Sequence, residues 1–348
     1  MCLHTPVPKG SLVPLTRRPQ RRASTTIALA ASLVVCLLAV AGCTTEPLDV
    51  GALTDPSTAQ LRDGARIATL PSRDPVPVEH DPAASSTASR IVAIDRNGTL
   101  GATVYALGLG PNVVGLSGST TFPAAAGVPR VTDPGHAVNV EKVLAQRPTI
   151  VLAGADSTPS GSLGQLRSAG IEVVEFTGER SVAGTPELLR RVAEALGARQ
   201  AGEKLVQRTQ AQIDAARSSL PDPTGDPTMA FLYIRGDRLI LLAGPGSGAD
   251  DLIVNLGGRD AGTEAGLSAS FTMVSTESLM RVDPDVILVM TQGAETVGGL
   301  DGVAQLPAVA GTSAGRAGRI IAMDETEVLA FGPDTGLVLG TLREAIYR

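Results

Sequence analysis

The sequence predicts an α/β fold made of two Rossmann-like lobes joined by one long helix, and three observations lead to this prediction. A motif of helix, proline and strand occurs twice within residues 89–348. Short apolar runs alternate with segments of helical periodicity in the same region, which is typical of parallel sheets covered by helices. A long amphipathic stretch between the two copies carries an apolar stripe at helical spacing.

The repeat consists of residues 141–152 and 277–288, which share the pattern E-x-[VL]-[LM]-x-x-x-P-x-[IV]-[VI]-L and lie 136 positions apart. A proline disfavours helical conformation in the residue before it. Each copy therefore predicts a short helix that ends before Pro148 or Pro284 and leads into a strand. The strands 150–153 and 286–289 are unbroken apolar runs, as expected of parallel strands that are buried on both faces.

The remaining elements follow from periodicity. Further strands are expected at 90–95, 113–116, 171–176, 229–234, 239–243 and 319–323. Helices are expected at 100–109, 163–168, 250–256 and 337–347. Residues 185–220 read as a short and a long helix separated at Gly197. From residue 198 to 220 the long helix would measure roughly 34 Å at the standard rise, enough to cross between lobes.

The first 43 residues have the layout of an export signal: basic residues up to Arg22, an apolar run at 27–38, and small residues before Cys43. A cysteine directly after Val-Ala-Gly resembles the lipobox of bacterial lipoproteins. The resemblance implies that residues 1–42 are a signal peptide and that Cys43 is diacylated, which anchors the protein on the extracytoplasmic face of the cell membrane. The alternative is a transmembrane helix, but the apolar run is shorter than the roughly 20 residues a span needs.

Residues 43–88 lack sustained periodicity and are rich in proline, so we expect a lipidated flexible tether with weak helix around 58–67. The expected domains are an N-terminal lobe at 89–184, linking helices at 185–220 and a C-terminal lobe at 221–348.

Composition excludes several functions. The formal net charge is −6 and no Lys/Arg-rich run follows the signal, which argues against nucleic acid as a partner. Only one histidine, His136, lies in the predicted lobes, so a bare metal site and a Ser-His-Asp hydrolase have little support. No glycine motif of the P-loop type (G-x-x-x-x-G-K-[ST]) or the Rossmann type (G-x-G-x-x-G) occurs, and we expect neither an enzyme nor a catalytic cofactor.

Tyr233 and Arg235 are the strongest candidates for residues that bind a ligand. Alternate residues of a strand share a face, so the phenol and the guanidinium should point the same way. Both stand at the carboxyl end of the strand, where ligands bind in open α/β sheets. A neighbouring guanidinium favours phenolate, which is a suitable donor for ferric iron. His136 lies in the loop before the first repeat, and the repeat offset places its counterpart in a loop around 271–273. Solvated histidine and half-buried tyrosine are the plainer alternatives.

Two α/β lobes joined by a long helix, with Arg90-Ile-Val in the first strand and both repeats, resemble the class III substrate-binding lipoproteins of ABC importers for iron-siderophores, cobalamin and haem. Thr132-Asp-Pro-Gly-His136 together with Tyr233-x-Arg235 resembles the haem-binding members from Gram-positive bacteria. That resemblance implies His136 and Tyr233 as axial ligands of the haem iron from opposite lobes, with Arg235 supporting Tyr233. Met290 matches a pocket methionine of these proteins, and Phe271 stands where a tyrosine is often found.

The resemblance implies a membrane-tethered receptor that carries haem as its transported ligand to an ABC permease and its ATPase, without catalysis. The first alternative is the same scaffold binding a ferric siderophore or cobalamin, with aromatic and arginine contacts instead of a His/Tyr pair. A lipoprotein enzyme with a nucleophile in the cleft is the alternative from another class.

Overall fold

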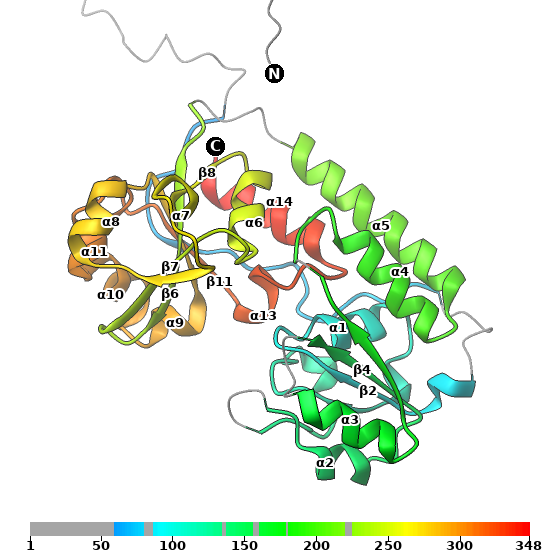
Figure 1. Ribbon diagram of the computed structural model, residues 1–348. Coiled ribbons are helices and arrows are strands. Elements are labelled where there is room, and N and C mark those ends of the chain that lie inside the picture. Colours follow the sequence, from blue (N-terminus) through cyan, green and yellow to red (C-terminus); the bar gives the residue numbers. More distant parts are fainter. Residues whose placement is uncertain (1–58, 80–85, 134–136, 156–159, 179, 220–224) are drawn as a thin grey trace, which may run out of the picture. The chain divides into compact units, whose positions relative to one another are not determined.

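The computed structural model describes residues 59–79, 86–133, 137–155, 160–178, 180–219 and 225–348 (Figure 1). The predicted signal peptide, Cys43 and His136 lie outside these residues, so the predictions about them stay predictions. Helices and parallel strands alternate through the described ranges, which confirms the α/β fold class. Among the same residues, no helix combines the length and the apolar character needed to span a membrane.

The N-terminal lobe is built on a four-stranded parallel sheet. Its strand order is β3 (Val113–Leu116), β2 (Ile91–Ile94), β4 (Ile150–Gly154) and β5 (Glu172–Phe176). Its helices are α1 (Thr99–Ala106), α2 (Val140–Ala145) and α3 (Ser160–Ser168), with 3-10 turns η2 (Ser86–Ser89), η3 (Gly110–Asn112) and η4 (Pro123–Ala125). Ile91 and Ala93 pack in one apolar cluster, and Val92 and Ile94 pack in another on the opposite face. Because both faces are buried, the strand sequences are continuously apolar.

The C-terminal lobe is built on a seven-stranded sheet. Its order is β1 (Arg66–Ile67), β11 (Ile320–Met323), β10 (Val286–Met290), β6 (Thr228–Arg235), β7 (Leu239–Ala243) and β9 (Phe271–Met273), with β8 (Arg259–Asp260) paired to β6. Strands β7 and β9 are antiparallel to their neighbours, and the other pairings are parallel.

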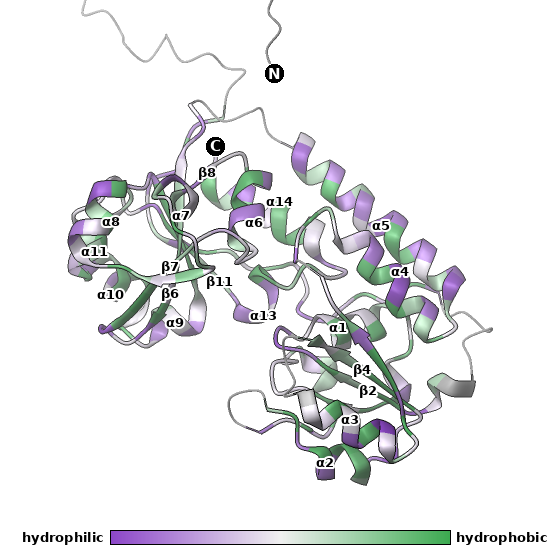
Figure 2. Ribbon diagram, viewed as in Figure 1, coloured by the Kyte–Doolittle hydropathy of each residue, from purple (hydrophilic) through white to green (hydrophobic). Residues whose placement is uncertain are grey.

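Helices surround this second sheet. They are α6 (Ala249–Asn255), α7 (Ala261–Glu264), α8 (Thr276–Val282), α9 (Thr291–Glu295), α10 (Gly299–Gln305), α11 (Pro307–Ala310), α12 (Ser313–Ala317), α13 (Glu325–Val328) and α14 (Thr335–Ile346). Figure 2 shows strongly hydrophobic strands in the interior of both lobes, while the helices carry hydrophilic as well as hydrophobic segments.

The two linking helices are α4 (Thr185–Ala195) and α5 (Arg199–Ser218), and Gly197 between them adopts φ +67°. The apolar stripe of α5 is shared by both lobes. Leu205 and Val206 belong to the apolar cluster of the N-terminal lobe, whereas Ile213 and Ala216 belong to that of the C-terminal lobe. We therefore propose that residues 89–184 and 221–348 form the two lobes and that 185–220 links them.

The repeat forms equivalent structure in both lobes. α2 and α8 each begin after a side-chain cap, Asn139 or Ser275, and each leads into a central strand, β4 or β10. The residue before each proline has left-handed backbone geometry, with φ +46° at Arg147 and +45° at Asp283. Caps, left-handed residues and strand ends all match at the same offset, which confirms the duplication predicted from the sequence.

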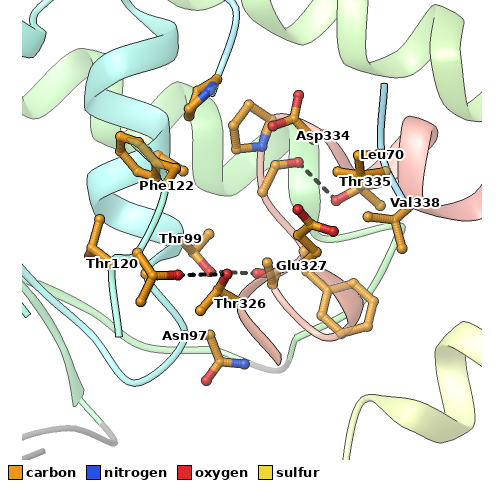
Figure 3. Close-up of a pocket in the computed structure, with 18 of the residues that line it drawn as sticks. Leu70, Asn97, Thr99, Thr120, Phe122, Thr326, Glu327, Asp334, Thr335 and Val338 are labelled. Carbon is orange, nitrogen blue, oxygen red and sulfur yellow. Dashed lines mark hydrogen bonds between the residues drawn. The ribbon is translucent and has the colours of Figure 1, made fainter. Parts of the chain in front are cut away.

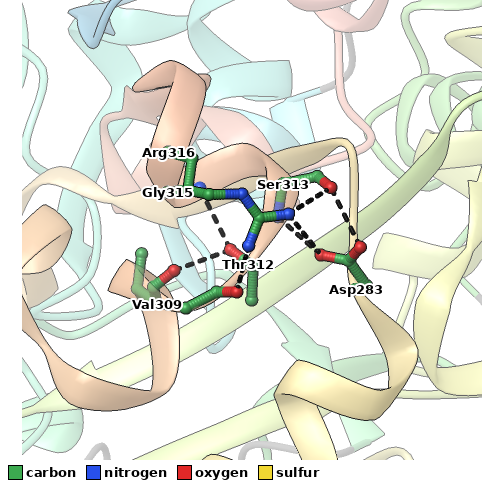
Figure 4. A network of polar contacts seen from close by, with 7 residues as sticks. Asp283, Val309, Thr312, Ser313, Gly315 and Arg316 are labelled. Atoms are coloured by element: carbon green, nitrogen blue, oxygen red, sulfur yellow. Dashed lines mark hydrogen bonds and ion pairs between the residues drawn. The ribbon is translucent and has the colours of Figure 1, made fainter.

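Asp283 also ties its turn to α12 (Figure 4). The Ser313 hydroxyl donates to Asp283 Oδ2 at 2.9 Å, and Arg316 forms an ion pair with Asp283 Oδ1 at 3.7 Å. Arg316 Nη2 additionally donates to Ser313 Oγ at 2.9 Å. The left-handed turn is therefore anchored through its own side chain in this copy of the repeat.

The predicted flexible tether is wrong for residues 59–79, which we call the strap. Its β1 pairs with β11, and the backbones of Gln60 and Arg348 are hydrogen-bonded at 2.8 Å and 3.2 Å. Ala59, Ala68 and Leu70 are buried in the core of the C-terminal lobe. The predicted helix around 58–67 is also replaced by this short strand. The strap covers the otherwise open edge of β11, a role that a two-residue strand does not reveal in the sequence.

The second half of the strap lies on the N-terminal lobe. The Val78 N–H donates to the Ala106 carbonyl at 2.8 Å, and the Ala124 N–H donates to Asp74 Oδ1 at 2.6 Å. Glu79 forms an ion pair with Lys204 of α5. The strap is thus a second segment, besides α5, that contacts both lobes.

Removing the strap should therefore destabilise the lobes. A chain that begins at residue 80 loses the burial of Leu70, worth about 1.5–3 kcal/mol, together with the edge hydrogen bonds. We expect it to melt on the order of 5–10 °C below a chain that begins at residue 59, measured by calorimetry. Leu70→Ala in the longer chain should give part of this loss. Equal melting temperatures of the two chains would contradict the structural role of the strap.

Candidate functional site

The carboxyl ends of the strands in the two sheets approach one another. After β2, Asn97 Nδ2 donates to the Leu329 carbonyl at 2.9 Å, and the Thr99 hydroxyl donates to the Ala330 carbonyl at 2.6 Å. Leu329 and Ala330 follow β11 and α13, so the segments beyond both sheets are in direct contact. This is the position at which open α/β sheets bind ligands.

Tyr233 and Arg235 lie at the carboxyl end of β6, in the middle of the larger sheet. They share a face with Phe231, which is fully buried, while both of their own side chains are half-buried. The Arg235 Cζ atom lies 4.5 Å from the centroid of the Tyr233 ring, and Arg235 Nη1 donates to the Ile234 carbonyl at 2.9 Å. The structure thus stacks the two predicted residues as a cation–π pair.

Phe271 extends this surface. Its ring centroid lies 6.2 Å from that of Tyr233 at an interplanar angle of 67°, an edge-on arrangement. Leu241 of β7 pairs with Tyr233 on one side and with Met273 of β9 on the other. Because paired residues share a face, these four side chains form one apolar platform, of which Phe271 is 36% and Met273 65% exposed.

Leu241 was not among the predicted site residues, and the segment 271–273, expected as a loop opposite the His136 loop, is instead the edge strand β9. The available signal was the strand-turn-strand pattern around Gly236, which has φ +64° in the turn between β6 and β7. Met290 ends β10, beside β6, and packs half-buried against the core that contains Phe231. Met290 therefore stands next to the strand that carries Tyr233 and Arg235.

His136 lies outside the described residues, and no distance from it to Tyr233 follows from the structure. The stems of its loop are described. Thr132 and Val138 form an antiparallel bridge, and Asp133 pairs with Lys142 of α2 at 2.8 Å. The hydrogen bond from Lys142 and that from Asn139 lower the pKa of Asp133. This loop continues from β3, so it belongs to the N-terminal lobe.

A cavity of about 650 Å³ lies where the strand ends of the N-terminal lobe face the other lobe. Asp95, Gly154 and Arg180 line one side, and Gly246 and Ser247 line the other. The two latter residues belong to the glycine-rich turn between β7 and α6, where backbone comes close to the cavity. Tyr233 is not among the lining residues, so the platform and this cavity are separate parts of the candidate site.

A second, small cavity of about 50 Å³ lies beneath the strap (Figure 3). Leu70 of the strap, Thr120 and Phe122 of the N-terminal lobe, and Glu327 and Asp334 of the C-terminal lobe all line it. Burial, reinforced by Asp324, raises the pKa of Glu327 to about 7, while Arg73 opposes the shift. Burial also raises the pKa of Asp334, although Arg208 lowers it. Two carboxyl groups are thus enclosed where the strap meets both lobes.

The family model described as "Periplasmic binding protein" matches residues 96–327, well over half of the chain. The chain belongs to the periplasmic binding protein family. The haem-binding protein HmuT has a solved structure that is 33% identical in sequence, with a TM-score of 0.75 over 84% of this chain and 99% of that chain. The agreement extends through both lobes of this binding protein.

Curated relatives also match by sequence. A cobalamin-binding protein of Halobacterium salinarum is 28% identical over 260 residues, which is 74% of this chain and 68% of that protein. The ABC transporter substrate-binding lipoprotein YvrC of Bacillus subtilis is 26% identical over 249 residues, or 70% of this chain and 76% of that one. This chain is therefore a substrate-binding protein of a class whose members bind haem or cobalamin.

The raised pKa of Glu327 predicts a pH-dependent stability of this binding protein. The folded state favours the protonated carboxyl group, so its stability should fall as the pH rises from about 4.5 through about 7. Glu327→Gln stays neutral, and we expect it to melt above the parent at pH 8 but close to it near pH 5. Glu344→Gln, at an exposed position, is the control. A Glu327→Gln difference that is constant with pH would contradict the prediction.

Proposed function

We propose that this protein is an extracytoplasmic receptor that binds haem and delivers it to an ABC permease and its ATPase, without catalysis of its own. The observation that carries the proposal is the Tyr233–Arg235 stack at the carboxyl end of β6, 4.5 Å apart and half-buried. A neighbouring guanidinium favours a phenolate ligand over a neutral phenol, and a phenolate is a donor that suits ferric haem iron.

The platform supports a flat, largely apolar ligand. Tyr233, Leu241, Phe271 and Met273 present ring, aliphatic and thioether surface on one face of three adjacent strands. A porphyrin can lie against such a surface while its iron is bound by a side chain. We propose that Phe271 and Met290 contact the macrocycle and that His136 supplies the second axial bond from the N-terminal lobe.

HmuT lends further support. Structures of HmuT variants exist in which one histidine, one tyrosine and one arginine are replaced by alanine. The tyrosine and arginine of HmuT are two positions apart, as are Tyr233 and Arg235. The histidine precedes that tyrosine by nearly the same distance along the chain as His136 precedes Tyr233.

The second candidate ligand is cobalamin, which the relative from Halobacterium salinarum is named for. A corrinoid brings its own cobalt and its own lower ligand, so it has no need of a phenolate with an adjacent guanidinium. The Tyr233–Arg235 pair therefore favours haem, and titration of the protein with hemin and with cobalamin separates the two candidates. Cobalamin binding without hemin binding would reject the haem proposal.

Alanine variants of the two proposed axial residues should differ in how they change haem binding and the absorbance spectrum. Tyr233→Ala removes the anionic donor and should release ferric haem on the order of tenfold faster or more, with loss of the phenolate charge-transfer band. His136→Ala should leave five-coordinate haem that still binds but dissociates faster than in the parent. Absorbance spectra and haem transfer to apomyoglobin measure both effects.

Tyr105→Phe is the matched control, because Tyr105 packs against Phe122 at a ring distance of 4.8 Å, away from the platform. Its spectrum and haem retention should equal those of the parent. If His136→Ala and Tyr233→Ala both keep the parental spectrum and the parental haem retention, the axial assignment is wrong.

We also propose that Cys43 carries the lipid that tethers the receptor to the membrane. The motif Val-Ala-Gly-Cys after an apolar run supports this, as does the likeness to the lipoprotein YvrC. Cells that express Cys43→Ala should accumulate uncleaved precursor without incorporated palmitate. Continued palmitate labelling of that variant would reject the lipid anchor.

A further inference from the structure

Glu325 holds an unsatisfied carboxylate oxygen close to the proposed site. It is the first residue of α13 and follows β11, which pairs with β10, which in turn pairs with β6. Its Oε1 accepts a hydrogen bond from the Gly293 N–H at 3.1 Å. Its Oε2 is buried and has no hydrogen-bond partner among the described residues. A buried acceptor without a donor is costly, so this oxygen needs an explanation.

Arg235 is the cation that acts on this carboxylate. Burial raises the pKa of Glu325, and the charge of Arg235 is among the influences that lower it. Gly293, which holds Glu325, also borders Arg235. A Cβ atom at Gly293 would lie 3.3 Å from Arg235 Nη1 and 3.0 Å from the Ile234 carbonyl oxygen. The absence of a side chain at position 293 therefore leaves room for the guanidinium between β6 and α9.

The Arg235 guanidinium can donate more hydrogen bonds than the one it makes to the Ile234 carbonyl. It carries five N–H groups, and within the described residues its Nη1 donates a hydrogen bond to the Ile234 carbonyl. It lies over the face of the Tyr233 ring, which attracts a cation less strongly than an anion does. When Tyr233 becomes a phenolate, Arg235 has an anion on each side.

We propose that Glu325 is a positioning residue for Arg235. Its charge attracts the guanidinium already in the haem-free protein, and its unpaired Oε2 accepts a hydrogen bond from the guanidinium when ligand iron binds Tyr233, which fixes the cation beside the phenolate. The inference rests on the proposed function, because it assigns Glu325 a part in the same haem site. Glu325 itself contacts neither the iron nor the macrocycle.

Glu325→Gln tests the inference, because it removes the charge but keeps an oxygen acceptor for the Gly293 N–H. We expect hemin to dissociate about threefold to tenfold faster from this variant than from the parent. In an Arg235→Ala background the same substitution should have no effect. Glu295→Gln is the control, since Glu295 lies on the same helix as Gly293 but is exposed. An unchanged rate, or an equal effect in both backgrounds, overturns the inference.

A measurement on the haem-free protein separates this inference from the proposed function. The Arg235 Nε–H resonance can be assigned by its loss in Arg235→Ala. We expect it to shift in Glu325→Gln and not in Glu295→Gln. If the parent fails to bind hemin, the proposed function is rejected, and a shifted resonance still supports the positioning of Arg235. A resonance that does not shift in Glu325→Gln overturns the inference.

Discussion

The packing of α5 into both apolar cores is the constraint on which the rest of the structure depends. Two glycines allow the close contacts. A Cβ atom at Gly202 would lie 2.4 Å from the Ala193 Cβ of α4, and one at Gly336 of α14 would lie 2.5 Å from the Gln212 backbone. Between these contacts Thr209 donates to the Pro333 carbonyl at 2.9 Å. The helix α5 therefore restricts how the two lobes can move relative to each other. Any such movement must either bend α5 or expose apolar side chains that it buries in one of the lobes.

The strap is a second link between the lobes, and it contacts the two lobes through different kinds of interaction. Its contact with the C-terminal lobe is strand pairing and apolar burial, whereas its contact with the N-terminal lobe consists of a few hydrogen bonds and the pair of Glu79 with exposed Lys204. Exposed ion pairs contribute little, so the N-terminal contacts are the weaker half. The enclosed carboxyl groups of Glu327 and Asp334 lie at the junction, where burial opposes their ionisation.

The sequence was sufficient for elements whose signal is local. The repeat, the stripe of α5 and the alternation of β6 each report burial directly, so they predicted two lobes, the link and the shared face of Tyr233 and Arg235. The sequence was insufficient for elements and side chains whose position depends on residues far away along the chain. Two-residue β1 is a strand only because β11 offers an open edge, and Met273 joins the site only through Leu241. Glu325 is near Arg235 in space but 90 positions away in sequence, with no pattern that connects them.

The two copies of the repeat also explain why the lobes differ at the site. Both supply a central strand whose carboxyl end faces the other lobe, but within the described residues the C-terminal lobe alone adds antiparallel strands, with β7 paired to β6 and β9 paired to β7. Antiparallel edges can leave one face open, and that face is the platform. In the N-terminal copy the position at the repeat offset from Thr272 of β9 is His136. The duplication therefore places two strand ends opposite each other, and the antiparallel strands add a flat apolar surface to one of the two lobes.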